Sequence, residues 1–140
     1  MTLLDVNVWL AASWARHTQH RVAKRWIDGQ DDELVFCRIT EMALLRLLTN
    51  QAVMRTDVRT RRQAWDILDR LYEDPRVRFL SEPPGLTPLW IAISKRDDTS
   101  HLLWTDDYLA AFAQAGHLTL ATLDASMRAR YPSVRVIDVQ

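Results

Sequence analysis

Short, mostly apolar segments alternate with longer amphipathic ones along the chain, and this alternation constrains the fold more than any other feature. Five short segments predict β-strands: residues 2–4, 34–36, 77–80, 118–122 and 134–137. Between them, apolar residues recur at helical spacing in residues 8–12, 17–28, 41–49, 59–72, 89–94, 107–114 and 127–131. Strands separated by helices predict an α/β fold with a largely parallel sheet between helices.

Length and composition indicate the domain organisation and exclude some classes of protein. The 140 residues contain no repeat and no linker, so we expect a single domain over residues 1–140. The single cysteine excludes an internal disulfide, and neither a signal peptide nor a membrane-spanning segment is visible, so we expect a cytoplasmic protein. The 18 basic and 18 acidic residues balance, unlike the charge of a strongly basic nucleic-acid module.

Acidic residues follow several of the predicted strands. Asp5 comes directly after the first strand between apolar neighbours, Glu41 lies just beyond the second, and Asp124 follows the fourth. Asp106 and Asp107 begin the helix that precedes the fourth strand. Sites in parallel sheets form at the carboxyl ends of the strands, so we expect these acids to meet there. An acid in a first helical turn also offsets the helix dipole, which is the structural interpretation of Glu41 and Asp107.

Several carboxylates close together indicate a bound cation. They cannot all stay ionised without one, and a set of oxygen ligands favours Mg²⁺ or Mn²⁺. Such a cation suits phosphodiester hydrolysis, because it polarises the phosphoryl group and activates water. It would also offset the repulsion between acidic residues and a phosphate backbone, so a net charge of zero is compatible with an RNA or DNA substrate.

Four stretches of the chain carry a family resemblance. LLDVNVWLA contains Asp5, HTQHRVAKRWID is a predicted early helix, RITEMALLRLLTN contains Glu41, and TDDYLAAFAQAGHLTLATLD contains Asp106 and ends at Asp124. In this order they resemble the PIN-domain nucleases, and specifically the VapC-type toxins of bacterial toxin–antitoxin systems.

The resemblance implies a fold, an activity and partners. The fold would be a three-layer α/β/α sandwich with a short, mainly parallel central sheet. The protein would be a Mg²⁺- or Mn²⁺-dependent endoribonuclease whose catalytic and metal-binding residues are Asp5, Glu41, Asp106 and Asp124. An activated water would attack the phosphodiester and the 3′-oxygen would leave. The resemblance also implies a homodimer, a small cognate antitoxin that blocks the site, and a structured RNA substrate such as tRNA or ribosomal RNA.

The chain departs from the family pattern at two positions. In many relatives the third acid is followed by alanine, whereas here Asp106 is followed by Asp107. This register favours Asp106 as the ligand and Asp107 as an accessory residue. A second aspartate often follows the fourth acid, but Ser126 stands there in this chain, so any additional metal contact would be weakened.

Four further polar residues are candidate accessories to the acids. We expect Asn7 to cap the helix that follows it and to orient Asp5, and Thr40 to cap the helix that carries Glu41. Thr122 could orient a carboxylate or a water. Arg46 either holds a carboxylate or phosphate of the site or pairs with an acid on its own helix surface.

Two other kinds of function compete with the nuclease. Asp5-Val6-Asn7 resembles the opening D-x-D of haloacid-dehalogenase-like phosphatases, but that family needs a second aspartate and a later lysine. Here the second position is Asn7, and neither Lys24 nor Lys95 lies at a predicted strand end. A phospho-receiver domain fails for the same reasons. A non-catalytic binding module with the same fold remains an alternative, because Ser126 replaces an acid.

Overall fold

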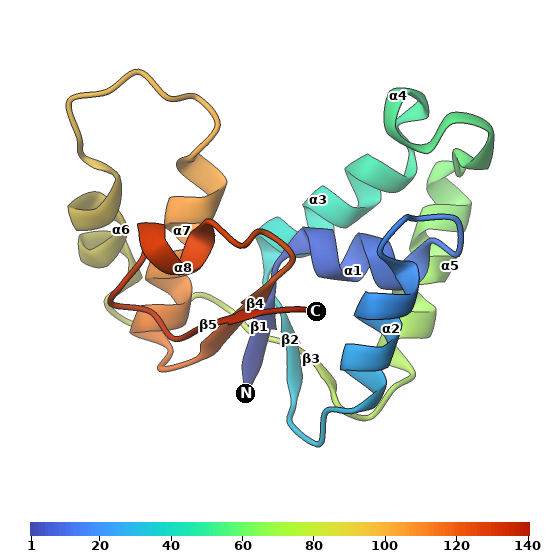
Figure 1. The fold of residues 1–140 in the computed structure, drawn as a ribbon, viewed down its shortest axis with the longest axis horizontal. Helices are drawn as coiled ribbons and strands as arrows, with labels where there is room; N and C mark the ends of the chain where they lie inside the picture. Colours follow the sequence, from blue (N-terminus) through green and yellow to red (C-terminus); the bar gives the residue numbers. More distant parts are fainter.

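Five short strands form one parallel sheet in the order β3-β2-β1-β4-β5. In the computed structural model, which describes residues 1–140, they are β1 (Thr2–Leu4), β2 (Leu34–Phe36), β3 (Val77–Phe79), β4 (Thr119–Thr122) and β5 (Val136–Asp138). Helices cover both faces of this sheet (Figure 1). The predicted α/β/α sandwich with a parallel central sheet is therefore confirmed.

Each face of the sheet has its own hydrophobic core. Leu4 and Phe36 pack into the core beneath α1 (Val6–Ser13), α2 (His20–Asp28), α3 (Arg38–Leu48) and α5 (Arg61–Tyr72). Leu3 and Val35 point the other way, into the core beneath α6 (Leu86–Ser94), α7 (Trp104–Ala115) and α8 (Met127–Arg130). Strand side chains alternate between faces, so β1, β2, β4 and β5 contribute to both cores, whereas β3 contributes only Val77.

Two connections between helices complete the fold. A short helix, α4 (Gln51–Met54), and the 3₁₀ turn η1 (Arg55–Asp57) join α3 to α5, and the sequence did not predict either of them. A loop over residues 95–103 joins α6 to α7. None of the helices has the length and apolar character needed to cross a membrane.

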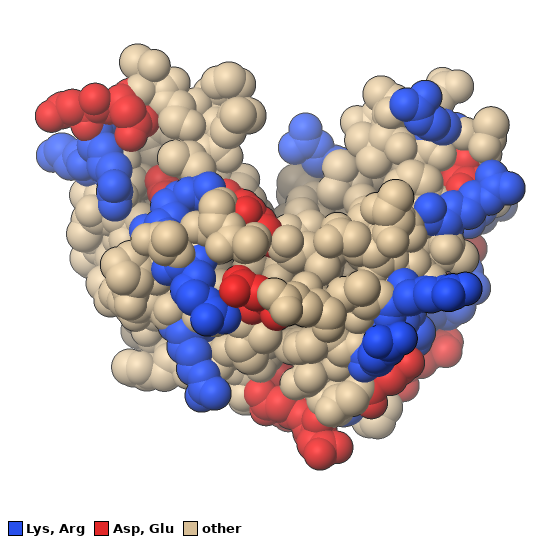
Figure 2. All heavy atoms as spheres, viewed as in Figure 1, with Lys and Arg blue, Asp and Glu red and all other residues tan.

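The strand order reverses between β1 and β4. The chain builds β1, β2 and β3 outward in one direction and then returns to place β4 on the other side of β1. Ligand sites of such sheets lie at the carboxyl ends of the strands where the order reverses. Figure 2 shows a wide hollow in the surface there, between the α6–α7 side and the α3–α4 side, with acidic side chains at its base.

The predicted N-caps of two helices, Asn7 and Thr40, were wrong. Asn7 does not cap α1, because the helix begins at Val6 and Asp5 occupies the N-cap position. Thr40 does not precede α3 but lies in its first turn, where its hydroxyl oxygen accepts a 3.0 Å hydrogen bond from the backbone N–H of the N-cap residue, Cys37. A single residue separates each of these helices from the preceding strand, and that residue, Asp5 or Cys37, occupies the N-cap position.

Candidate active site

Asp5 is held at the centre of the sheet's carboxyl edge. Its backbone N–H donates to the carbonyl of Ala121 at 2.9 Å, which continues the pairing of β1 with β4 beyond the last strand residue. Its side chain is 6% exposed and accepts a 2.8 Å hydrogen bond from the hydroxyl of Thr122. Burial raises the pKa of Asp5 against the effect of this hydrogen bond, and the nearby charge of Asp106 raises it further. No basic side chain forms an ion pair with Asp5.

Thr122 connects three parts of the site. Besides donating to Asp5, its fully buried hydroxyl accepts hydrogen bonds from the amide of Asn7 at 3.1 Å and from the backbone N–H of Asp124 at 3.0 Å. The side-chain carbonyl of Asn7 in turn accepts from the backbone N–H of Leu123 at 3.1 Å. Asn7 and Thr122 therefore fix the turn after β4 against the start of α1, and with it the relative positions of Asp5 and Asp124.

Arg130 of α8 bridges two further acids. Its guanidinium donates to Asp106 at 2.9 Å, lies 3.9 Å from Asp124, and donates to the hydroxyl of Ser126 at 2.7 Å. Burial raises the pKa of Asp106 although Arg130 opposes the rise, while hydrogen bonds from Ser126 lower the pKa of Asp124. Arg130 was not predicted from the sequence, where its only signal is its position in a short helix soon after Asp124.

The two adjacent aspartates of α7 face different neighbours. Asp106 accepts a hydrogen bond from Arg130, and the nearby charge of Asp124 contributes to raising its pKa. Asp107 is buried and accepts a 2.5 Å hydrogen bond from the hydroxyl of Tyr131. Successive helical residues point about 100° apart, so only one of the pair can face Asp5 and Asp124. That residue is Asp106.

Glu41 and Arg46 of α3 lie apart from this network. The carboxylate of Glu41 accepts hydrogen bonds from the hydroxyl of Tyr72 at 2.6 Å and from Arg38 at 2.5 Å, and no hydrogen bond links it to Asp5, Asp106 or Asp124. Arg46 is exposed, makes no ion pair and lines a groove between α3 and α5. Neither an ion pair with a site acid nor one on its own helix surface is formed.

The residues at the sheet edge fit a divalent cation by their chemistry. No group of three or more acidic, His or Cys side chains has a geometry that could hold a metal ion as it stands. All the candidate ligands are nevertheless carboxylates, which suit hard cations. A buried carboxylate without a cationic partner, as at Asp5, is costly. A bound cation would supply the missing counter-charge.

Replacing Asp5 by Asn should stabilise the metal-free protein. The substitution removes a buried charge next to Asp106 and keeps an acceptor for Thr122, so the free energy of unfolding at neutral pH should rise by roughly 0.5–2 kcal/mol. Because the pKa of Asp5 is raised in the folded state, the wild type gains stability as the pH falls through that pKa. The difference in the free energy of unfolding between Asp5→Asn and the wild type should then vanish. Urea unfolding in EDTA at neutral and acidic pH measures this. The exposed Asp98→Asn variant is the control, and equal stability of Asp5→Asn and wild type at neutral pH would contradict the interpretation.

Comparisons with known proteins agree with this architecture. The PIN domain family matches residues 2–131. Ribonuclease VapC41 of Mycobacterium tuberculosis is 37% identical over 132 residues, covering 90% of both chains. Ribonuclease VapC31 of the same organism is 31% identical over 140 residues, covering 98% of this chain and 97% of the relative.

Solved structures show the same fold at lower sequence identity. VapC20 of Mycobacterium tuberculosis, described as a toxin that cleaves the sarcin-ricin loop, superposes with a TM-score of 0.70 at 17% identity, covering 96% of this chain and 99% of VapC20. The FitAcB structure from Neisseria gonorrhoeae superposes with a TM-score of 0.69 at 20% identity, covering 98% and 96% of the two chains. The fold, the family match and the identity to these relatives lead to one conclusion: the chain belongs to the PIN domain family and, within it, to the VapC-type ribonucleases.

Proposed function

We propose that the protein is a Mg²⁺- or Mn²⁺-dependent endoribonuclease that acts as the toxin of a toxin–antitoxin pair. The observation that carries the proposal is Asp5, a buried carboxylate with no basic partner at the edge where the strand order reverses. Asp106 and Asp124 lie beside it in the network of Arg130 and Thr122. Family membership adds support, because the relatives VapC41 and VapC31 are named ribonucleases.

Four acidic residues of the chain would hold the cation in the proposed reaction. Asp5, Asp106 and Asp124 would hold the cation, together with Glu41 once its carboxylate leaves Tyr72 and Arg38. A bound divalent cation supplies the Lewis acid that phosphodiester hydrolysis requires.

Other residues position these carboxylates or meet the substrate. Thr122 and Asn7 keep Asp5 and Asp124 in register, so that little rearrangement is needed at the carboxyl edge of the sheet. Arg130 presents a planar guanidinium beside the same acids, where it can pair with an RNA phosphate.

The proposed partners are a structured RNA, such as tRNA or ribosomal RNA, a small antitoxin and a second copy of the chain. VapC20, which has the same fold, is described as cleaving the sarcin-ricin loop. Other chains with this fold come from a toxin–antitoxin complex of Klebsiella pneumoniae and from VapBC2 of Rickettsia felis bound to promoter DNA. A small neighbouring reading frame that encodes a DNA-binding protein would support the antitoxin.

A cleavage assay with defined cations tests the proposal. The purified protein should cleave total tRNA or ribosomal RNA in Mg²⁺ or Mn²⁺, and EDTA should abolish cleavage because the carboxylates then lack their cation. Asp5→Asn should be inactive in the same assay. Sequencing of the RNA ends after controlled expression would identify the target. Activity that survives both EDTA and Asp5→Asn would overturn the proposal.

A further inference from the structure

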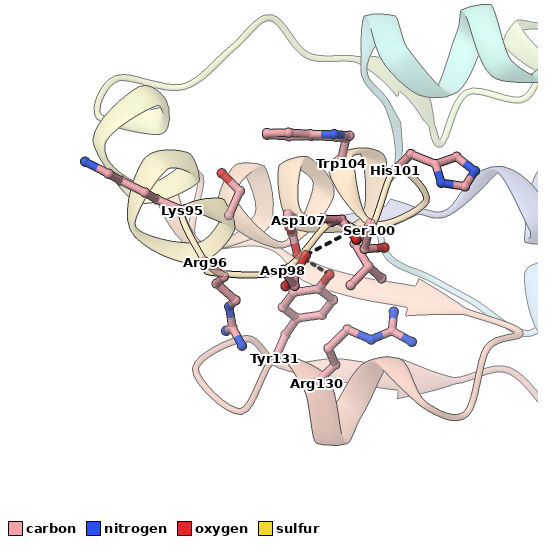
Figure 3. A pocket seen from close by; sticks show the side chains of 12 residues that line it. Lys95, Arg96, Asp98, Ser100, His101, Trp104, Asp107, Arg130 and Tyr131 are labelled. Carbon is pink, nitrogen blue, oxygen red and sulfur yellow. Dashed lines mark hydrogen bonds between the residues drawn. The ribbon is translucent and has the colours of Figure 1, made fainter.

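A polar pocket lies beside the candidate active site, under the loop that joins α6 to α7. It has a volume of about 430 Å³, within the range of ligand-binding pockets. Figure 3 shows Trp104 on one side of it and Tyr131 and Arg130 on the opposite side. Of its lining residues, the proposed reaction uses only Arg130.

Trp104 is an exposed aromatic side chain that contacts a second tryptophan, Trp90. It lies in the first turn of α7, two residues before Asp106, and its side chain is 56% exposed. Its ring meets the ring of Trp90 edge to face, with 6.4 Å between centroids, and Trp90 in turn packs edge to face against Tyr108. A large exposed aromatic side chain that packs against other aromatic rings is the kind of platform on which an unpaired nucleobase stacks.

The charges around the pocket suit a nucleotide. Lys95 and Arg96 line it and form no ion pair with any acid. Two acids also line the pocket: Asp107 accepts a hydrogen bond from the hydroxyl of Tyr131, and Asp98 accepts one from the backbone N–H of Ser100. The unpaired positive charges of Lys95 and Arg96 can meet phosphates while a base occupies the interior.

Arg130 links the pocket to the acids. It lines the pocket and at the same time donates to Asp106 at 2.9 Å. A strand whose phosphate lies at the acids would bring the next nucleotide to this pocket. Single-stranded loops offer such bases, because they are free to leave the stack.

We propose that this pocket binds an unpaired nucleotide of the substrate RNA, adjacent to the scissile phosphate, by stacking its base on Trp104. The inference rests on the proposed ribonuclease function and adds a specificity subsite to it. Selection of the cleavage site would then depend on an unpaired base next to the cleaved bond, as well as on the shape of the surrounding RNA.

Binding without catalysis tests the subsite. The probe is a short single-stranded RNA with a 5′ fluorophore, together with versions that each carry one abasic nucleotide, measured by fluorescence anisotropy in EDTA. Trp104→Ala should weaken binding of the intact RNA roughly five- to a hundredfold, the range for loss of one stacked base. Trp104→Phe should retain most of the affinity. Trp65→Ala removes a similarly exposed tryptophan (52%) from α5 and should leave binding nearly unchanged.

The abasic series separates stacking from a general loss of affinity. In the wild type, one abasic position should weaken binding as much as Trp104→Ala does, and in that variant the same position should have no further effect. Equal binding by the Trp104→Ala and Trp65→Ala variants, or a loss that no abasic position reproduces, would overturn the subsite. Because the binding assay contains no divalent cation, a protein that binds RNA in this way but never cleaves it in Mg²⁺ or Mn²⁺ would contradict the proposed function and leave the subsite standing.

Discussion

Asp106→Asn is expected to reduce the rate of metal-dependent RNA cleavage by at least about a hundredfold. Replacing a residue that only supports a metal ligand typically lowers metal affinity or activity ten- to a hundredfold, and Asp106 is proposed to be a ligand itself. The neutral amide keeps an acceptor for Arg130 but removes the negative charge that lies between Asp5 and Asp124. The measurement is the initial rate of cleavage at saturating Mg²⁺.

The neighbouring Asp107 provides a matched control. Asp107→Asn changes the same functional group one residue further along α7 and keeps an acceptor for Tyr131. It should retain cleavage to within about tenfold, because this side chain is turned away from Asp5 and Asp124. A larger loss for Asp107→Asn than for Asp106→Asn would show that the register of the third acid is shifted by one residue.

The second large effect is expected at Thr122. This residue does not contact the substrate, either in the proposed reaction or in the proposed subsite. Thr122→Val keeps the shape of the side chain but leaves the amide of Asn7, the backbone N–H of Asp124 and the carboxylate of Asp5 without their shared partner. Unpaired buried polar groups cost about 1–3 kcal/mol each, so we expect destabilisation of at least this size. We also expect cleavage to fall roughly ten- to a hundredfold.

Serine at the same position separates the hydroxyl from the packing. Thr122→Ser keeps all three hydrogen bonds and loses one methyl group, which costs about 1 kcal/mol, so its cleavage rate should stay near that of the wild type. Because the Thr122 hydrogen bond lowers the pKa of Asp5, Thr122→Val should also move the acidic limb of the pH–rate profile to higher pH. If Thr122→Val and Thr122→Ser have the same pH profile, the hydroxyl does not act through Asp5.

The fold and the central part of the site could be predicted because local patterns specify them. The strands are too short and too apolar for helices, and helices separate them, so parallel pairing follows. Parallel strands bring their carboxyl ends to one edge, which is why Asp5 and Asp124 lie near each other although they are 119 positions apart in the sequence. The catalytic and metal-binding roles of these residues, and that of Glu41, remain predictions.

What the sequence did not reveal depends on side chains that reach across the fold. Arg130 of α8 donates a hydrogen bond to Asp106 of α7, and Tyr72 of α5 donates one to Glu41 of α3. No periodicity or spacing marks such contacts, because they depend on the packing of helices that are distant in sequence. The pocket beneath the α6–α7 loop was missed for the same reason, since its walls come from two separate stretches of the chain, residues 94–107 and 130–131.

The two-sided burial of β1 has a consequence for how chains of this kind can vary in length. Leu3 faces one core, Leu4 faces the other, and Asp5 follows at once. An insertion or deletion of a single residue within β1 would exchange the two leucines between the cores and turn Asp5 away from Thr122. Loops such as residues 95–103 carry no such restriction. Insertions and deletions in related sequences should therefore gather in those loops, while the spacing from the first strand to its acid stays constant.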